Sequence, residues 1–388
     1  MTAVSYGREV ALSSRRERRS LLALVRHIDF VLVGCTFALS LVGIVMVYSA
    51  TRNLLVAQGL SSHYYLERQA VWVLVGTIVM VTVAAIDYRR FRDWAYLIYG
   101  LVVMGLVGVF VVGRSALGAL RWYQLGPLQL QPSEFAALGL IVALASYCSR
   151  RQGVLAFRQI IGLLVLAVVP MVLVYKQPDL GTTIVLGVTL AAMMLAADVR
   201  LRYLFLLFLL VIGGFVLALK LHLLHAYQIT RLTSFLHQNQ DTQSSNYELS
   251  MTRNAISAGG LKGVGIDHGL ATNLGLIPNQ YTDFIFSAVG EQLGFIGSAV
   301  IIGLFGIISV RMLRAAQMAK DTFGRLVCVG AAAWLAFSVF ENIGMNIGIM
   351  PITGIPLPFL SYGGSATFSF FAAVGLVLNV EMRRLPRR

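Results

Sequence analysis

The chain has 388 residues, of which 57% are hydrophobic and 12% are charged. This composition excludes a soluble globular protein and indicates a chain that crosses a membrane several times. The net charge of +14 does not indicate a nucleic-acid partner, because the Lys and Arg residues are spread between apolar runs, as membrane topology requires. Cys35, Cys148 and Cys328 lie inside apolar runs, so neither a disulfide framework nor a zinc site is expected.

The apolar runs predict an all-α polytopic membrane protein with about ten transmembrane helices. Residues 1–27 are expected to form a basic cytoplasmic tail, residues 28–380 the transmembrane domain, and residues 381–388 a second cytoplasmic tail. The first apolar run is long enough to span and follows too many arginines to be a cleaved signal. The expected spans are 28–50, 71–87, 95–113, 133–149, 159–175, 181–197, 203–222, 284–310, 326–349 and 360–380.

The distribution of basic residues predicts how the chain is oriented. With both termini in the cytoplasm, most of the 31 Lys and Arg residues fall on the cytoplasmic side of these spans. The positive-inside rule is then satisfied. We therefore expect a multi-pass protein of the plasma membrane with both termini cytoplasmic.

The longest extracytoplasmic loop is expected at residues 223–283, between the seventh and eighth spans. A loop of this length in a compact membrane protein is usually functional. Within it, residues 247–258 are compatible with a short interfacial helix, and the glycines of 259–265 predict a flexible turn. Three prolines in 351–358 predict a rigid outer connection that is neither helix nor strand.

Acidic residues recur at the outer ends of the predicted helices. Segments 131–134, 177–182 and 277–283 each place an acid beside a proline at a helix start. One such acid is ordinary, because it complements the helix dipole by about 0.3–1 kcal/mol. Several acids on one face predict a functional cavity, because acids within the membrane are costly and usually face one. These acids are Glu134, Asp179, Asp283, Glu291 and Glu341.

Asp283 is the candidate for the reacting group, because it lies where the long polar loop meets an apolar helix. A carboxylate there reaches a lipid headgroup without the roughly 2.5–3.5 kcal/mol cost of a charge at the bilayer centre. The alternative is that Thr282 or Asp283 caps the helix, its side-chain oxygen accepting hydrogen bonds from the first turn.

Basic residues share the outer face and are suited to bind the oxygens of a phosphorylated lipid. The alternative for each is an ion pair or a side chain that snorkels to the interface. Trp122 is expected to anchor the chain at the membrane interface, with stacking on a sugar ring as the alternative. The candidate substrate-binding residues are Arg68, Arg114, Arg121, Trp122, Glu134, Lys176, Asp179, Arg231, Arg253, Lys262, Thr282, Glu291 and Ser361.

Taken together, these segments resemble the SEDS family of peptidoglycan glycosyltransferases, which includes RodA, FtsW and SpoVE. The resemblance runs from Asp29 to Arg384, and the short polar tails are more similar to RodA than to FtsW. The motifs that carry it are Tyr48-Ser49-Ala50, Arg68-Gln69, Arg121-Trp122, Gln131-Pro132-Ser133-Glu134, Gln177 to Thr182, Thr282 to Phe286, Gly290-Glu291, and Pro351 to Ser365.

The resemblance implies polymerisation of lipid II into glycan strands at the outer face of the bacterial plasma membrane, in cell-wall elongation and shape control. It also implies undecaprenyl diphosphate as the leaving group and a class B penicillin-binding protein, a transpeptidase, as the partner. The essential acid of the family falls on Asp283. No cofactor is required by the residue pattern, and a divalent cation, Mg²⁺ or Mn²⁺, is compatible with the diphosphate.

Four positions depart from the family pattern. The lysine expected three residues after Glu134 is Ala137, and glutamine is replaced by Met251. Asn279 and Tyr281 stand where the segment before Thr-Asp usually carries glutamate and histidine. These departures affect substrate contacts and leave the aspartate in place.

The mechanism implied for Asp283 is that of a general base. It would take the proton from the 4-hydroxyl of the acceptor sugar as that oxygen attacks the anomeric carbon of the donor. A lipid flippase or transporter is the main alternative, and a non-catalytic scaffold for a transpeptidase is another. The predicted acids lie mainly toward the outer face, which favours surface chemistry over transport.

Overall fold

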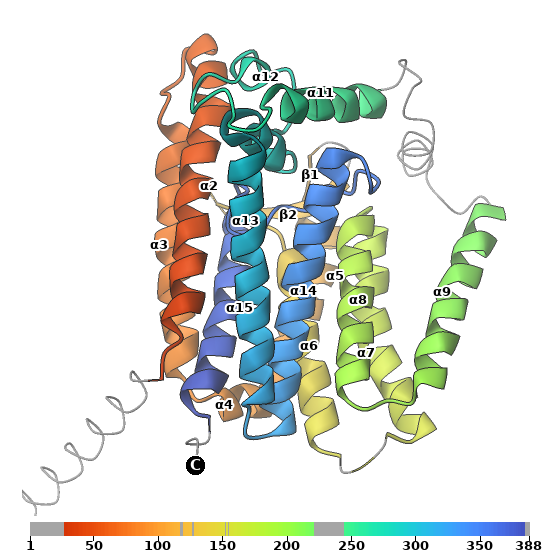
Figure 1. The fold of residues 1–388 in the computed structure, drawn as a ribbon. Coiled ribbons are helices and arrows are strands. Elements are labelled where there is room, and N and C mark those ends of the chain that lie inside the picture. The colour runs from red at the N-terminus through yellow and green to blue at the C-terminus, as the bar shows by residue number, and fades with distance from the viewer. Residues whose placement is uncertain are drawn as a thin grey trace, which may run out of the picture.

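The computed structural model describes residues 27–116, 119–125, 128–151, 153, 155–220 and 244–384 (Figure 1). Seven helices are long and apolar enough to cross a membrane, and shorter apolar helical segments lie at Ser133–Ser149, Leu180–Ala196 and Leu201–Leu210. Each of the ten predicted spans coincides with one of these helices, so the prediction of an all-α polytopic membrane protein is confirmed. Arg231, within 221–243, and residues 1–26 and 385–388 of the predicted tails lie outside the described residues.

The helices follow one another along the chain, and a small sheet interrupts their succession once. They are α2 Phe30–Ala57, α3 Tyr64–Ala85, α4 Tyr88–Asp93, α5 Ala95–Val112, α6 Ser133–Ser149, α7 Phe157–Lys176, α8 Leu180–Ala196, α9 Leu201–Lys220, α11 Ser244–Ala258, α12 Leu270–Asn273, α13 Ile285–Gln317, α14 Thr322–Ile347 and α15 Gly364–Met382. The strands are β1 Arg114–Ala116, β2 Ala119–Leu125 and β3 Leu128–Leu130.

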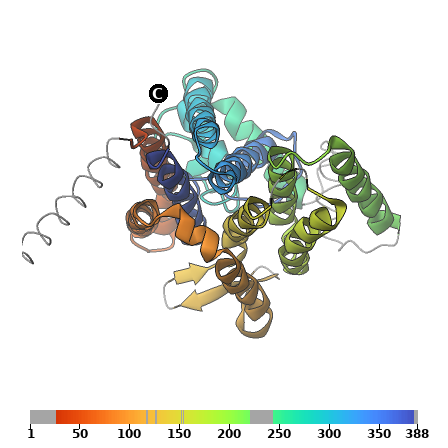
Figure 2. The same cartoon turned by 90° about the horizontal axis from the view of Figure 1, so that it is seen from below.

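Two helices, α14 and α15, form the centre of the bundle. Their most apolar windows are 67% and 89% buried, against 17% for α5. α14 packs against α6, α8, α13 and α15, and α15 packs closely along α3. Viewed along the helices, α9 lies at the edge of the bundle (Figure 2). Glycine permits the tightest approach: a Cβ on Gly375 of α15 would lie 2.6 Å from the carbonyl oxygen of Met80 in α3.

The segment 114–130 differs from the loop that the sequence predicts. β1, β2 and β3 form a three-stranded antiparallel sheet in that order, with Arg114 opposite Trp122. The hydroxyl of Tyr123 donates a hydrogen bond to the carbonyl of Gly105, at 2.9 Å, and so fastens the sheet to α5. Cross-strand pairing with this side-chain anchor gives the segment a fixed place outside the bundle.

The helix α13 is broken by a kink at Gly294, where φ is 65° and ψ is −164°. The freed N–H groups of Phe295 and Ile296 donate to the carbonyls of Gly260 and Leu261 at 2.9 and 3.1 Å. In return, the N–H groups of Val264 and Gly265 donate to the carbonyls of Glu291 and Gln292. The predicted flexible turn 259–265 is therefore docked in the kink, where it satisfies backbone groups that a break would otherwise leave unpaired.

The outer elements lie over one end of the bundle (Figure 1). α11 covers the predicted interfacial helix at 247–258, and the connection 351–357 contains neither helix nor strand, as predicted. The helix of the eighth span, α13, begins at Ile285, before the kink, and continues to Gln317, seven residues past the predicted end.

We expect Gly294→Ala to destabilise the protein, because the left-handed φ costs a non-glycine residue about 1–3 kcal/mol and the Cβ would overlap the backbone nitrogen of Gly263. Thermal unfolding in detergent measures the effect, and proteolysis of 259–265 reports release of that segment. Gly303→Ala is the matched control, since a Cβ at Gly303 of the same helix meets nothing within 4 Å. Equal melting temperatures for the two variants would contradict this account of the kink.

Candidate active site

Asp283 lies in a tight turn that precedes α13. The N–H groups of Thr282 and Asp283 donate to the carbonyl of Asn279 at 3.1 and 3.2 Å, and Asn279 itself has a positive φ of 52°. The N-cap of α13 is Phe284, with no side-chain capping bond, while the hydroxyl of Thr282 donates to Asn279. The N-cap position therefore falls on Phe284, one residue after Asp283.

The main chain of Asp283 is held by α14. The side-chain amide of Asn342 donates to the carbonyl of Asp283 at 2.8 Å and to the carbonyl of Ile355 at 2.7 Å. Asn346, one turn later, donates to Asp283 at 3.4 Å. Sequence reasoning missed both asparagines, although two amides four residues apart in an apolar helix were a usable signal. Their bonds join the turn at Asp283 to the connection 351–357.

The carboxylate of Asp283 lies beside Gly354. A Cβ on Gly354 would be 3.3 Å from Oδ2 of Asp283, and the φ of Gly354 is 77°. The side chain of Asp283 is half-buried. The absence of a side chain at position 354 therefore leaves space beside one carboxylate oxygen.

Ser361 braces the other side of the turn. Its hydroxyl donates to the carbonyl of Thr282 and accepts a hydrogen bond from the N–H of Leu357 at 2.8 Å. The N–H of Tyr362 donates to the carbonyl of Tyr281 at 2.9 Å. Ser361 is 3% exposed, so the structure gives it a positioning role next to Asp283.

Tyr281, one of the departures from the family pattern, belongs to an aromatic cluster. Its ring centroid lies 4.9 Å from that of Tyr65 and 5.8 Å from that of Tyr362. Burial raises the pKa of the Tyr281 hydroxyl well above its ordinary value, so this group stays neutral at physiological pH. Arg68 lies 4.2 Å over the ring of Tyr64 and also interacts with the hydroxyl of Tyr362.

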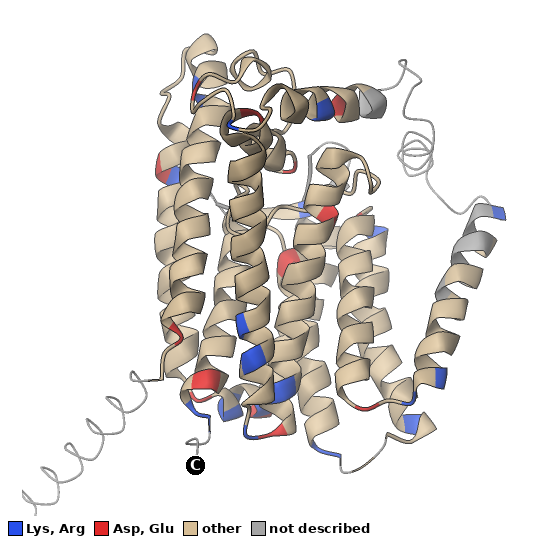
Figure 3. Cartoon of the chain, viewed as in Figure 1, with Lys and Arg blue, Asp and Glu red and all other residues tan. Residues whose placement is uncertain are grey.

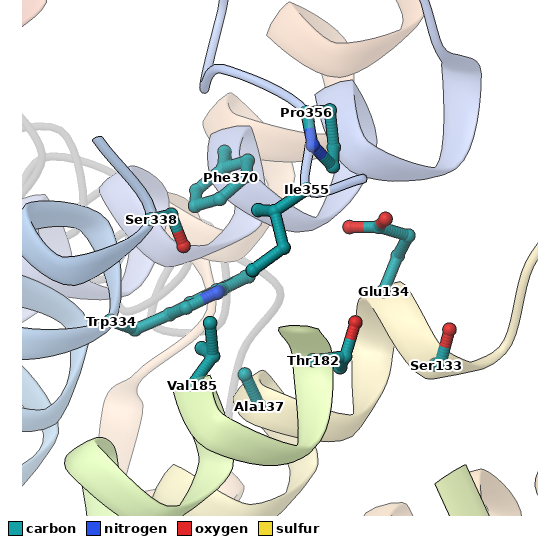
Figure 4. A pocket seen from close by; sticks show the side chains of 10 residues that line it. All are labelled: Ser133, Glu134, Ala137, Thr182, Val185, Trp334, Ser338, Ile355, Pro356 and Phe370. Carbon is teal, nitrogen blue, oxygen red and sulfur yellow. The ribbon is translucent and has the colours of Figure 1, made fainter. Parts of the chain in front are cut away.

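Glu134 opens α6 and borders a small cavity between α6, α8, α14 and the 351–357 connection. Figure 4 shows its carboxylate pointing into the cavity on the side of Ile355. Glu134 interacts electrostatically with both Asp179 and Asp283. Ala137, which stands in place of the expected lysine, also lines this space, and no lining residue is basic. The lining residues are Ser133, Glu134, Ala137, Thr182, Val185, Trp334, Ser338, Ile355, Pro356 and Phe370.

Asp179 is the N-cap of α8. Its carboxylate accepts from the N–H of Thr182 at 3.1 Å and from its hydroxyl at 3.0 Å. Arg121, from β2, donates to the carbonyls of Gln177 and Pro178. The segment 177–182 therefore connects the sheet to the start of α8. The charged groups of Arg121 and Asp179 are hydrogen-bonded within this connection.

Glu291 is 1% exposed and holds α12. Its carboxylate accepts from the N–H groups of Ala271 and Thr272 at 2.8 and 3.1 Å, and from the Thr272 hydroxyl at 2.6 Å. These contacts give Glu291 a structural role within the outer elements. These hydrogen bonds explain why a carboxylate is buried here, and no contact with a substrate is needed to explain it.

The other candidate residues are spread over the outer end. Lys176, Arg253 and Lys262 are exposed, and Trp122 is half-buried in β2. Arg114 is placed by its backbone pairing with Trp122. Within the described residues, no three His, Cys, Asp or Glu side chains are close enough to hold a metal ion, so these acids do not fit a protein-held Mg²⁺ or Mn²⁺.

We expect Ser361→Ala to lower the melting temperature and to speed hydrogen exchange at residues 281–284. Two backbone groups lose a buried partner, at a cost of about 1–3 kcal/mol. Ser309→Ala is the control, because the Ser309 hydroxyl bonds within its own helix, to the carbonyl of Phe305. If exchange at 281–284 were the same in both variants, Ser361 would not position the turn.

Comparison with known proteins gives consistent matches over nearly the whole chain. The family model FtsW/RodA/SpoVE, described as cell cycle protein, matches residues 30–385. A probable peptidoglycan glycosyltransferase FtsW from Trichlorobacter lovleyi is 37% identical, with 91% of this chain and 93% of the relative covered. The stage V sporulation protein E of Bacillus subtilis is 35% identical, with 91% and 96% covered.

Two solved structures share the fold. One describes how a peptidoglycan synthase complex coordinates polymerization and crosslinking; it matches with a TM-score of 0.76 and 30% identity, covering 91% of this chain and 97% of that one. The other is the rod shape determining protein RodA of Thermus thermophilus, with a TM-score of 0.69 and 30% identity. It covers 93% of this chain and 98% of that one.

Proposed function

The chain belongs to the FtsW, RodA and SpoVE family and is a peptidoglycan glycosyltransferase, and we propose that it polymerises lipid II with Asp283 as the general base. The observation that carries this assignment is that hydrogen bonds from the bundle hold Asp283 in place. Its backbone carbonyl is held from α14 by Asn342, and its half-buried carboxylate lies beside Gly354. A carboxylate held in a fixed position at the outer end of the bundle is suited to proton transfer.

The reaction is an inverting displacement. The carboxylate of Asp283 takes the proton of the 4-hydroxyl of the acceptor sugar, and the oxygen forms a bond to the anomeric carbon of the donor. The bond from that carbon to the diphosphate breaks, and undecaprenyl diphosphate leaves with the electron pair. A positioned base contributes about 10²–10⁴-fold, and the remainder comes from holding the two lipids in register.

Glu134 is the second acid of the site. It borders the cavity and interacts with Asp283, so we assign it to hydrogen bonds with sugar hydroxyls. We assign the exposed Lys176, Arg253 and Lys262 to neutralisation of the diphosphate, together with Arg231 from its place in the sequence. Arg121, Asp179, Glu291 and Ser361 instead support the site through their contacts with the protein.

The orientation supports this assignment. In Figure 3 the Lys and Arg residues of the described chain gather mainly at the end of the bundle opposite the outer elements. By the positive-inside rule that end faces the cytoplasm. Asp283 then lies on the extracytoplasmic side of the bacterial plasma membrane, where lipid II is consumed.

The partner that we propose is a class B penicillin-binding protein. The support is the likeness to a structure described as a peptidoglycan synthase complex that joins polymerization to crosslinking. We further assign the chain to elongation and cell shape. The likeness to a rod shape determining protein supports this role.

We expect Asp283→Asn to reduce lipid II polymerisation by about 10²–10⁴-fold, because the amide keeps the size but cannot accept the proton. Glycan ladders made by the purified complex with its transpeptidase measure the rate. Asp267→Asn is the matched control, since Asp267 is an outer-face aspartate paired with Arg52 at 3.0 Å.

Three outcomes separate the candidate functions. A parental rate for Asp283→Asn would show that the aspartate is not the base. Transport of lipid II across vesicles with no ladders would indicate a flippase. Intact strand synthesis with lost complex formation in the variant would indicate a scaffold.

Depletion of the relative that determines rod shape in a rod-shaped bacterium, with this chain supplied in its place, tests the elongation role: we expect this chain to keep the cells rod-shaped. Without it we expect rounded cells with continuing septation, since loss of side-wall synthesis removes the cylinder. Microscopy after depletion measures this outcome, with re-expression of that relative as the control. Rounded cells in the presence of this chain would contradict the elongation role.

A further inference from the structure

The end of the bundle opposite Asp283 carries a second hollow, between the C-terminal ends of α13 and α15. Its volume is about 630 Å³, and its lining is Arg311, Arg314, Gln317, Met318 and Arg384. We propose that this hollow binds the phosphate of an anionic phospholipid headgroup. It lies outside the glycosyltransferase site and has no part in the chemistry at Asp283.

Two of its arginines are held in place by buried acids. Arg311 pairs through Nε with Asp29, whose side chain is 1% exposed, and Arg384 pairs with Glu381 at 3.1 Å, where the acid is 3% exposed. Nη1 of Arg384 also lies 3.4 Å from the sulfur of Met318. A buried carboxylate therefore anchors each of these two guanidinium groups, and both arginines line the hollow.

Arg314 supplies the third cation. It follows Arg311 by one helical turn on α13 and is exposed, and within the described residues its side chain has no ion pair or hydrogen bond. Three guanidinium groups against two carboxylates leave one positive charge, which matches a single phosphodiester. Guanidinium groups bind phosphate oxygens through parallel hydrogen bonds, which favours this ligand over a simple counterion.

The surface next to Arg314 indicates a lipid and not a soluble phosphate. Val300, Ile307 and Val310 are 58%, 43% and 50% exposed, and at helical spacing they form an apolar stripe that ends at Arg314. An acyl chain can lie along this stripe while its phosphate reaches the arginines. Basic pockets between helices at the cytoplasmic boundary are suited to anionic headgroups.

Native mass spectrometry of the purified full chain tests the site, with phosphatidylglycerol, phosphatidylcholine of the same acyl chains, or glycerol phosphate added. We expect phosphatidylglycerol to bind the parent more tightly than the other two. Arg314→Gln should weaken that binding about fivefold, as expected for the loss of one arginine near a membrane surface. Arg158→Gln, which removes an exposed arginine in the first turn of α7, should bind like the parent.

The melting temperature without lipid is measured in parallel, and Arg314→Gln should match the parent because Arg314 is exposed. Equal binding of phosphatidylglycerol by the parent and Arg314→Gln would overturn the proposal. So would equal binding of phosphatidylglycerol and phosphatidylcholine, or binding of glycerol phosphate as tight as that of the lipid.

Discussion

One amide holds the two irregular segments of the candidate site together. Nδ2 of Asn342 donates to the carbonyls of Asp283 and Ile355, which belong to a turn and a connection with no helix of their own. Backbone groups at membrane depth must be satisfied inside the protein, because hydrocarbon offers no partner. The buried core of α14 supplies that partner, and Ser361 supplies a second one from the far side of the turn. The position of the Asp283 carboxylate therefore depends on the most buried helices and not on the loop.

The sequence was sufficient to predict the spans, for physical reasons. Long apolar runs have few alternatives to a transmembrane helix, so all ten expected spans match helices. The prolines of 351–358 exclude regular structure, and the connection has none. Asp283 stood out because it lies where the long polar loop meets an apolar helix, and its half-buried position beside Gly354 is compatible with the role proposed for it.

Contacts between distant segments were beyond the reach of sequence patterns. An acid at a helix start looks the same whether it faces a substrate or caps a helix, and Asp179 and Glu291 bind backbone N–H groups of α8 and α12. In the sequence alone, Arg121 is a candidate ligand for a phosphate. In the structure, its guanidinium group donates hydrogen bonds to the carbonyls of Gln177 and Pro178. The sheet at 114–130 and the docking of 259–265 also depend on partners that no local pattern specifies.

The break at Gly294 divides α13 into a short outer piece and a long rod within the bilayer. The outer piece is hydrogen-bonded to the 259–265 segment, and the turn before it is attached to α14. On the other side of the break, Phe295 and Ile296 are hydrogen-bonded to the same segment, and α13 packs against α2 and α14. The break is therefore braced from both sides, and the level of Asp283 relative to the bundle is set by the protein core.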